Sequence, residues 1–137
     1  MVRVIMGVKG SGKTKQMIEM INSEVKSEHG TIVCIERGSK LTYDIHSKIR
    51  LVEASNYDMN SFTFLKGFIS GMYACNFDIT HMFIDSLCRV VPSDAGDAEL
   101  ENFLDWLNAF SESNGLKFTL TISADSSLAS DGVKKYF

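Results

Sequence analysis

The stretch that decides the fold is Gly7-Val8-Lys9-Gly10-Ser11-Gly12-Lys13-Thr14. It matches the pattern G-x-x-x-x-G-K-[ST] at every position, with an apolar run at residues 2–6 before it and a helical pattern at residues 14–25 after it. Backbone N–H groups can wrap a phosphate chain where residues without a Cβ let the backbone approach closely. The following helix points its unpaired N–H groups and the positive end of its dipole at the same place. The stretch therefore predicts a phosphate-binding loop between a strand and a helix.

Each residue type in this loop has an expected role. Contacts to a nucleotide are expected from Gly7, Val8, Lys9, Gly10, Ser11, Gly12, Lys13, Thr14 and Lys15. Lys13 is expected to reach the β- and γ-phosphates and to take part in the chemistry, and the Thr14 hydroxyl is expected to hold Mg²⁺. Lys9 has two interpretations, a solvated loop charge or a second contact to the phosphates.

The composition is that of an ordinary globular domain. A chain of 137 residues can bury a sizeable core, so we expect one nucleotide-binding domain over residues 1–137. No apolar run approaches the roughly 18 residues of a membrane span. The three cysteines form no C-x-x-C pair, and Cys34 and Cys88 lie in or just after apolar runs, which together indicates buried free thiols in a reducing compartment. We therefore expect a cytoplasmic protein without a membrane partner.

Charge is unevenly distributed along the chain. The net charge is −3, yet residues 1–50 carry an excess of basic side chains and residues 51–137 an excess of acidic ones. The basic part contains the phosphate loop, as an anionic ligand favours. An acidic chain is not typical of nucleic-acid-binding domains, so nucleic acid is not an expected partner.

Strand and helix patterns alternate along the chain. Apolar residues at helical spacing recur at residues 14–25, 61–72 and 98–113, and strand-like runs recur at residues 2–6, 31–35, 49–54, 80–84 and 117–123. This alternation predicts an α/β fold, a three-layer α/β/α sandwich around a mainly parallel five-stranded sheet. A short helix followed by an edge strand at residues 133–137 is expected at the end.

Several residues have expected local roles in these elements. Gly30 is expected to take the left-handed conformation past the first helix. Asp94 or Asp97 is expected to cap the helix at 98–113. Gly67 and Gly71, four residues apart, are expected to let their helix pack closely against the sheet.

Two carboxylates follow apolar strands and are candidates for the chemistry. Asp85 ends the run at 80–84 and is expected to order Mg²⁺ at the carboxyl edge of the sheet, the alternative being a cap on the next turn. Glu36 ends the run at 31–35, and with Arg37 it either faces the nucleotide or forms a solvated charge pair that opens a loop. Residues 38–48 form an irregular connection and a candidate substrate loop. His81 has no partner cluster of histidines or cysteines and is expected to be structural.

The chain resembles the P-loop NTPase superfamily at Gly7–Thr14, and its layout is similar to the minimal core of the RecA and thymidine-kinase branches. Asp85-Ser86 resembles the Asp-Ser pair that ends the metal-binding strand in the RecA family, and Glu36 lies where that family keeps a catalytic carboxylate. The resemblance implies a spatial strand order of 3-2-4-5-1. It also implies a polar residue near Ser123 that senses the γ-phosphate.

The chain also departs from these relatives. Thymidine kinases place a glutamate after the aspartate and carry a zinc-binding lasso, whereas here Ser86 follows Asp85 and no cysteine quartet exists. The guanine-specific motif [NT]-K-x-D is not found, so ATP is the expected nucleotide. The chain is similar as well to short ATP-binding proteins of Gram-positive anaerobes that are sometimes labelled after the twitching-motility ATPase. The acidic and histidine boxes of those motors are missing, and pilus retraction is not inferred.

Three functions follow from these patterns. The first is an Mg²⁺-dependent ATPase in which Glu36 polarises the attacking water and Arg37 or Arg89 stabilises the transferred charge. The second is a small-molecule kinase, of the nucleoside type, that transfers the ATP γ-phosphate. The third is a switch in which ATP and ADP order a loop differently and a protein partner responds. The sequence leaves the acceptor, the partner and the oligomeric state open.

Overall fold

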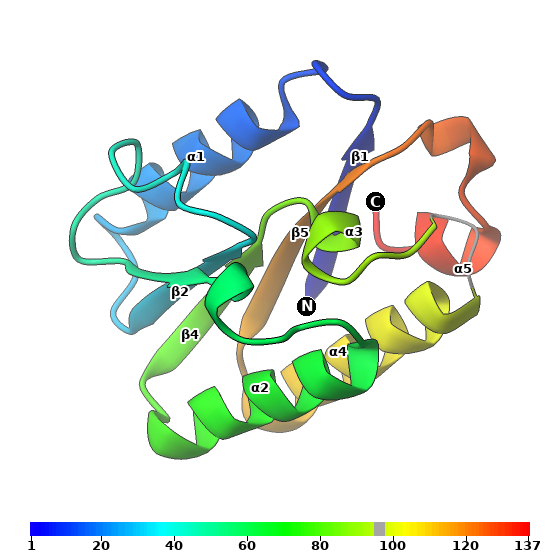
Figure 1. The fold of residues 1–137 in the computed structure, drawn as a ribbon. Coiled ribbons are helices and arrows are strands. Elements are labelled where there is room, and N and C mark those ends of the chain that lie inside the picture. Colours follow the sequence, from blue (N-terminus) through cyan, green and yellow to red (C-terminus); the bar gives the residue numbers. More distant parts are fainter. Residues whose placement is uncertain (95–97) are drawn as a thin grey trace.

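A computed structural model describes residues 1–94 and 98–137 (Figure 1). The strands are β1 (Val2–Gly7), β2 (Thr31–Glu36), β3 (Arg50–Glu53), β4 (Ile79–Ile84) and β5 (Lys117–Ser123). The helices are α1 (Lys13–Glu24), α2 (Phe62–Cys75), α3 (Leu87–Val90), α4 (Ala98–Asn114) and α5 (Asp131–Lys134), with 3-10 turns at Ala54–Asn56 and Ser126–Leu128.

The five strands form one parallel sheet in the order β1-β5-β4-β2-β3. This order confirms the α/β fold and the strand arrangement that the resemblance implies. Paired strands end together, with Gly7 opposite Ser123 and Glu36 opposite Glu53. The carboxyl ends of the strands therefore line one edge of the sheet, where open α/β folds place their ligands.

Helices cover the two faces of the sheet differently. Side chains of α2 and α4 pack on one face, and Figure 1 shows these two helices side by side. On the other face α1 contributes Met17 and Ile21, which pack with Leu41, Ile45 and Ile49 from the connection between β2 and β3. This connection is irregular, as predicted, and it was also a candidate substrate loop. Its buried apolar residues cover this face of the sheet beside α1.

The end of the chain differs from its predicted structure. The edge strand expected at 133–137 is wrong, because Asp131–Lys134 forms α5 and its Val133 is fully buried. The hydroxyl of Tyr136 donates to Asp105 Oδ1 at 2.5 Å, and Lys135 Nζ lies 3.0 Å from the same atom. These contacts hold the tail on α4. A single backbone bond, from Val4 N to the Tyr136 carbonyl at 2.7 Å, joins it to β1.

Three glycine predictions are also wrong. Gly67 and Gly71 lie on the exposed side of α2, where an added Cβ would meet nothing within 4 Å, so they do not serve close packing against the sheet. Gly30 does not have a positive φ. It is needed because an added Cβ would collide with the Thr80 side chain and the Asp78 carbonyl. The helix expected at 98–113 forms, but the proposed cap Asp97 lies outside the described residues.

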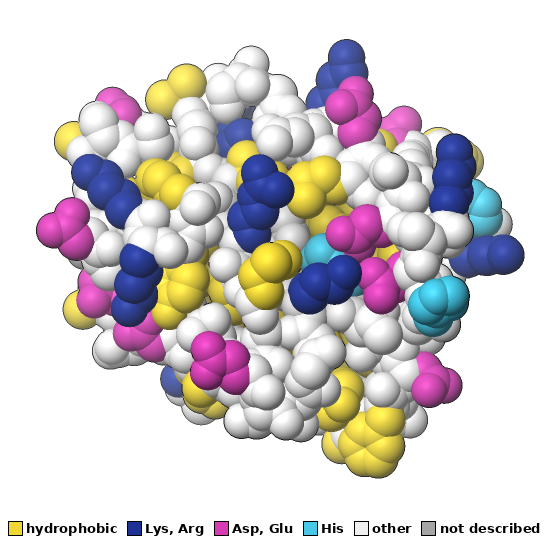
Figure 2. All heavy atoms as spheres, turned by 180° about the vertical axis from the view of Figure 1, so that it is seen from behind, with side chains coloured by type: hydrophobic (Ala, Val, Ile, Leu, Met, Phe, Trp, Pro, Cys, Tyr) yellow, Lys and Arg dark blue, Asp and Glu magenta, His cyan; other side chains and the backbone are white. Residues whose placement is uncertain are grey.

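The surface mixes charges of both signs. On the face behind the view of Figure 1, Lys and Arg side chains are interspersed with Asp and Glu (Figure 2). None of the helices in the described part of the chain has the length and apolar character that crossing a membrane requires.

Candidate functional site

The phosphate loop connects β1 to α1 as its sequence predicts. Gly10 and Gly12 have φ values of 86° and 85°, in the left-handed region that favours glycine. Gly7 has a different reason, because an added Cβ would lie 2.6 Å from Ser11 Oγ. The loop closes with a bond from Ser11 N to the Val8 carbonyl at 3.1 Å. The helix then begins at Lys13, with Gly12 as its N-cap residue.

Lys13 lies over this loop rather than in solvent. Its side chain is only 8% exposed, and Nζ donates to the Val8 carbonyl at 3.1 Å. An ammonium has three donors, so this bond leaves donors for an anion in the loop. The structure thus keeps the charge of Lys13 beside the backbone N–H groups that the glycines expose.

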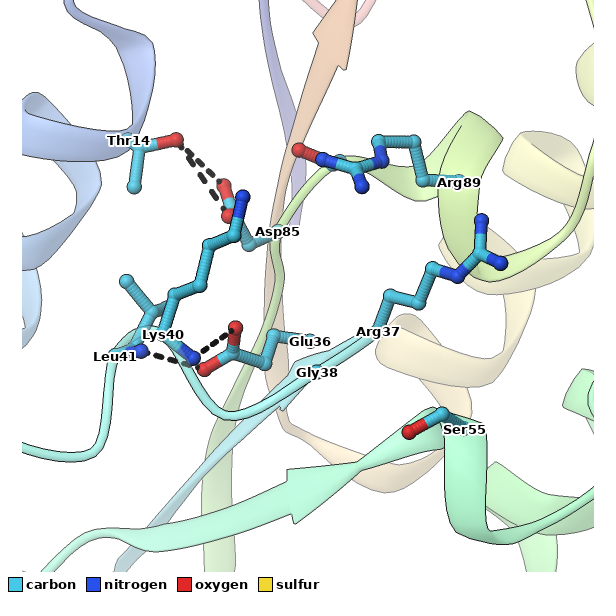
Figure 3. Close-up of a pocket in the computed structure, with 10 residues that line it drawn as sticks. Thr14, Glu36, Arg37, Gly38, Lys40, Leu41, Ser55, Asp85 and Arg89 are labelled. Carbon is cyan, nitrogen blue, oxygen red and sulfur yellow. Dashed lines mark hydrogen bonds between the residues drawn. The ribbon is translucent and has the colours of Figure 1, made fainter.

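Asp85 and Thr14 meet at the carboxyl edge of the sheet (Figure 3). The Thr14 hydroxyl donates to Asp85 Oδ1 at 3.2 Å, although 71 residues separate the two. Asp85 is 9% exposed, and its backbone N–H donates to the Ile35 carbonyl at 2.9 Å. Hydroxyl and carboxylate oxygens are the ligands that Mg²⁺ prefers, so the two residues fit a magnesium ion.

Thr121 was not identified from the sequence, yet it fixes this carboxylate. Its hydroxyl donates to Asp85 Oδ1 at 2.7 Å and accepts from the Ser86 backbone N–H at 2.7 Å. Thr121 belongs to β5 and is fully buried. The available signal was the pair of threonines at 119 and 121, which alternate with the apolar residues Phe118, Leu120 and Ile122.

Ser86 turns the chain sharply between β4 and α3. Its φ of 52° and ψ of 61° lie in the left-handed region, and it is the one non-glycine residue with positive φ in residues 1–94 and 98–137. A non-glycine residue in this region costs roughly 1–2 kcal/mol. Such strain concentrates at functional sites. Here it directs α3, which carries Arg89, across the edge of the sheet.

Glu36 is buried, which excludes the interpretation as a solvated charge. The residue is 5% exposed, Oε1 accepts from Lys40 N at 3.1 Å, and Oε2 accepts from Leu41 N at 2.8 Å. Burial raises the pKa of this carboxyl, the two backbone bonds oppose that rise, and the nearby charges of Asp85 and Glu53 add to it. Glu36 therefore anchors the start of the β2–β3 connection at the site.

Two adjoining cavities surround these residues. The first, of about 580 Å³, lies over the phosphate loop and is lined by Lys9, Gly10, Gly12, Lys13, Thr14, Lys15, Lys40, Ser86, Arg89 and Ser123. The second, of about 360 Å³, is lined by Thr14, Glu36, Arg37, Gly38, Lys40, Leu41, Ser55, Asp85, Ser86 and Arg89. The two cavities share four lining residues and therefore form one crevice; these are Thr14, Lys40, Ser86 and Arg89. Val8 and Ser11 contribute backbone to the loop but do not line the crevice.

His81 lies at the other end of β4, in a separate cluster. It is 1% exposed, with Nδ1 2.6 Å from Glu24 Oε2 and Nε2 2.8 Å from Thr119 Oγ1. Three possible metal-ligating atoms lie within 4.8 Å of one another, as a metal site requires; they belong to Glu24, Glu28 and His81. Lys117 Nζ, however, already forms an ion pair with Glu28 at 3.0 Å. A cation of the protein itself therefore satisfies this cluster, and we interpret it as structural.

The chain thus has an α/β fold with one parallel sheet, a glycine-rich loop between β1 and α1, and an acidic residue directly after β4. Among solved structures, the chain is similar to the flagellar accessory protein FlaH from Methanocaldococcus jannaschii, with a TM-score of 0.60 and 11% sequence identity. The likeness covers 98% of this chain and 65% of the FlaH chain, so this chain spans less than two thirds of that protein. No family model matches the sequence, and no curated protein matches it.

Proposed function

We propose that this chain binds MgATP and acts as a slow ATPase or as a nucleotide-dependent switch. The observation that carries the proposal is the hydrogen bond from the Thr14 hydroxyl to Asp85 Oδ1 at 3.2 Å, next to Lys13. A hydroxyl, a carboxylate and an ammonium are the three groups that a magnesium-bound triphosphate needs at this point. The fold shared with FlaH supports the proposal in its general form.

In this proposal each group has a separate task. The N–H groups of the loop bind the phosphates, and Lys13 exchanges its bond to the Val8 carbonyl for one to a phosphate oxygen. Thr14 and Asp85 hold Mg²⁺, which neutralises phosphate charge when it is bound. Arg89 lines both parts of the crevice and is suited to stabilise charge on the transferred phosphoryl group.

Glu36 links the chemistry to the switch. A carboxylate oxygen can accept more than one hydrogen bond, so Glu36 can orient a water while it holds Lys40 and Leu41. A change at Glu36 caused by the γ-phosphate would then alter the anchoring of Lys40 and Leu41. The same residue therefore serves both the hydrolytic and the switching form of the proposal.

The test identifies the nucleotide that the protein retains. Purified protein is mixed with excess MgATP, recovered quickly, and its bound nucleotide is identified, with Lys13→Ala as the control. Bound ADP supports hydrolysis, and Glu36→Gln should then leave ATP intact on the protein. Intact ATP supports a switch, which predicts different hydrogen exchange at residues 38–48 with ATP and with ADP. If no nucleotide depends on Lys13, the proposal is wrong.

A small-molecule kinase is the second candidate, and the shape of the crevice favours it. Beyond Asp85 and Glu36 the cavity continues to Arg37 and Ser55, which leaves space for an acceptor next to the expected γ-phosphate. This function predicts slow turnover of ATP alone and strong stimulation by one metabolite. A broad screen of nucleosides and nucleotides in which no compound stimulates turnover would count against it.

A further inference from the structure

A third cavity continues the crevice away from the phosphate loop. Its volume is about 280 Å³, and its polar lining consists of Arg37, Ser55, Asp58, Asn60 and Arg89. We call it the arginine cavity. It shares three lining residues with the cavity of about 360 Å³, namely Arg37, Ser55 and Arg89, so the two spaces adjoin.

The two arginines reach this cavity from different elements. Arg37 follows β2 directly, Arg89 belongs to α3, and Figure 3 shows both side chains on the same side of the crevice. In the part of the chain that the structure describes, neither guanidinium forms an ion pair. Two guanidinium groups therefore flank one hollow, and in the described residues neither is paired with a carboxylate.

The backbone that carries these side chains is fixed. Ser55 N donates to the Arg37 carbonyl at 2.9 Å, which ties the start of the 3-10 turn after β3 to the end of β2. Arg89 N donates to the Ser86 carbonyl at 2.8 Å, inside the strained turn after β4. The cavity is thus built on the ends of neighbouring strands, whose hydrogen bonds fix the backbone of Arg37, Ser55 and Arg89.

The chemistry of the lining selects an anion. A guanidinium presents a planar set of donors that matches phosphate and carboxylate oxygens in pairs. The Ser55 hydroxyl and the Asn60 amide add neutral donors, while Asp58 is the one acid in the lining and can accept from a ligand hydroxyl. A volume of about 280 Å³ suits a small molecule and not a polymer.

We infer that the arginine cavity is a second ligand site, for a small anion that carries a phosphate or carboxylate group and binds beside the nucleotide. The binding itself needs only the arginine cavity, although the ligand's role, as acceptor or regulator, rests on the proposed function. In the kinase form of that function, the anionic group would anchor the acceptor away from the reacting phosphate.

The test is an NMR titration of the full chain saturated with MgADP, using inorganic phosphate in one arm and succinate in the other. We expect saturable shifts of the Ser55 and Asn60 signals in at least one arm. Arg37→Gln should weaken this binding by about tenfold or more, and Arg37→Lys, which keeps the charge without the planar fork, should weaken it less. Arg50→Gln removes the same charge from the exposed start of β3 and should have no effect.

The possible outcomes separate this site from the phosphate loop. The inference would be overturned if Arg37→Gln and Arg50→Gln lost affinity for the anion equally, or if neither probe gave a saturable shift. Shifts confined to residues 10–14 that vanish in Lys13→Ala would do the same, because the anion would then occupy the loop alone. If nucleotide fails to bind while the Arg37-dependent shifts persist, the proposed function falls and this inference stands.

Discussion

At the residue scale, the position of one carboxylate depends on a threonine that touches no ligand in our proposal. Asp85 follows a buried strand, and a free carboxylate there could adopt several orientations. Thr121 removes that freedom, because its hydroxyl bonds Asp85 Oδ1 and also satisfies the Ser86 N–H in the strained turn. The β5 strand therefore positions a group that belongs to β4.

Thr121→Val should cost about 1–3 kcal/mol in the free energy of unfolding, because the part-buried Ser86 N–H loses its partner and Asp85 Oδ1 loses the shorter of its two hydrogen bonds. It should also weaken Mg²⁺-dependent nucleotide binding. Urea denaturation and nucleotide titration with and without Mg²⁺ measure the two effects. Thr63→Val, at an exposed position on α2, is the matched control and should change neither. An unchanged magnesium dependence in Thr121→Val would remove the positioning role.

At the element scale, glycines of the same chain have opposite effects on stability. Gly67 and Gly71 occupy the exposed side of α2, where they reduce helix stability without a packing benefit in the described structure. Gly30 lies before β2, where Thr80 and Asp78 leave no room for a side chain. Sequence spacing did not separate these cases, because the four-residue interval of Gly67 and Gly71 suits either face of a helix.

Gly67→Ala and Gly71→Ala should each stabilise the protein by about 0.5–1 kcal/mol, since alanine restricts the unfolded chain and meets no neighbour in the helix. Gly30→Ala should destabilise it, because the methyl group forces β2 away from the start of β4. Thermal and urea unfolding of the three variants give the comparison. A loss of stability in both α2 variants would show that this face packs against something, for example a second copy of the chain.

At the scale of the whole molecule, the sequence predicted what local pattern and spacing determine. The phosphate loop, the parallel α/β arrangement and the meeting of Thr14 with Asp85 follow from a motif and from strands that end at one edge. The tail at 133–137 was mispredicted because a stretch this short, with apolar residues only near its two ends, fits a strand and a helix equally well, and contacts to Asp105 decide between them. The grouping of Arg37 with Arg89 depends on two turns whose geometry no local pattern encodes.

The buried cluster at the other end of the sheet makes the whole fold sensitive to acid. His81 joins β4 to the end of α1 through Glu24 and to β5 through Thr119. The pKa of His81 is lowered to about 3, mainly by burial; the charges of Lys117 and the N-terminus add to this shift, and Glu28 opposes it. An unfolded histidine titrates near pH 6.5, so between about pH 3 and 6.5 the unfolded chain binds the extra proton.

Stability should therefore fall as the pH drops below about 6.5, with a contribution from His81 that approaches roughly 1.4 kcal/mol per pH unit. Burial raises the pKa of Glu24. Just above its unfolded pKa the folded chain therefore binds a proton at this carboxyl more readily than the unfolded chain does, which offsets part of the slope. His81→Gln should be less stable than the wild type at pH 7, but the gap should narrow by pH 5, because the variant has no imidazole to protonate. His29→Gln, at an exposed site, should keep the wild-type slope. Urea unfolding from pH 7 to pH 5 measures these slopes, and parallel curves for the wild type and His81→Gln would show that protonation of His81 does not limit the fold.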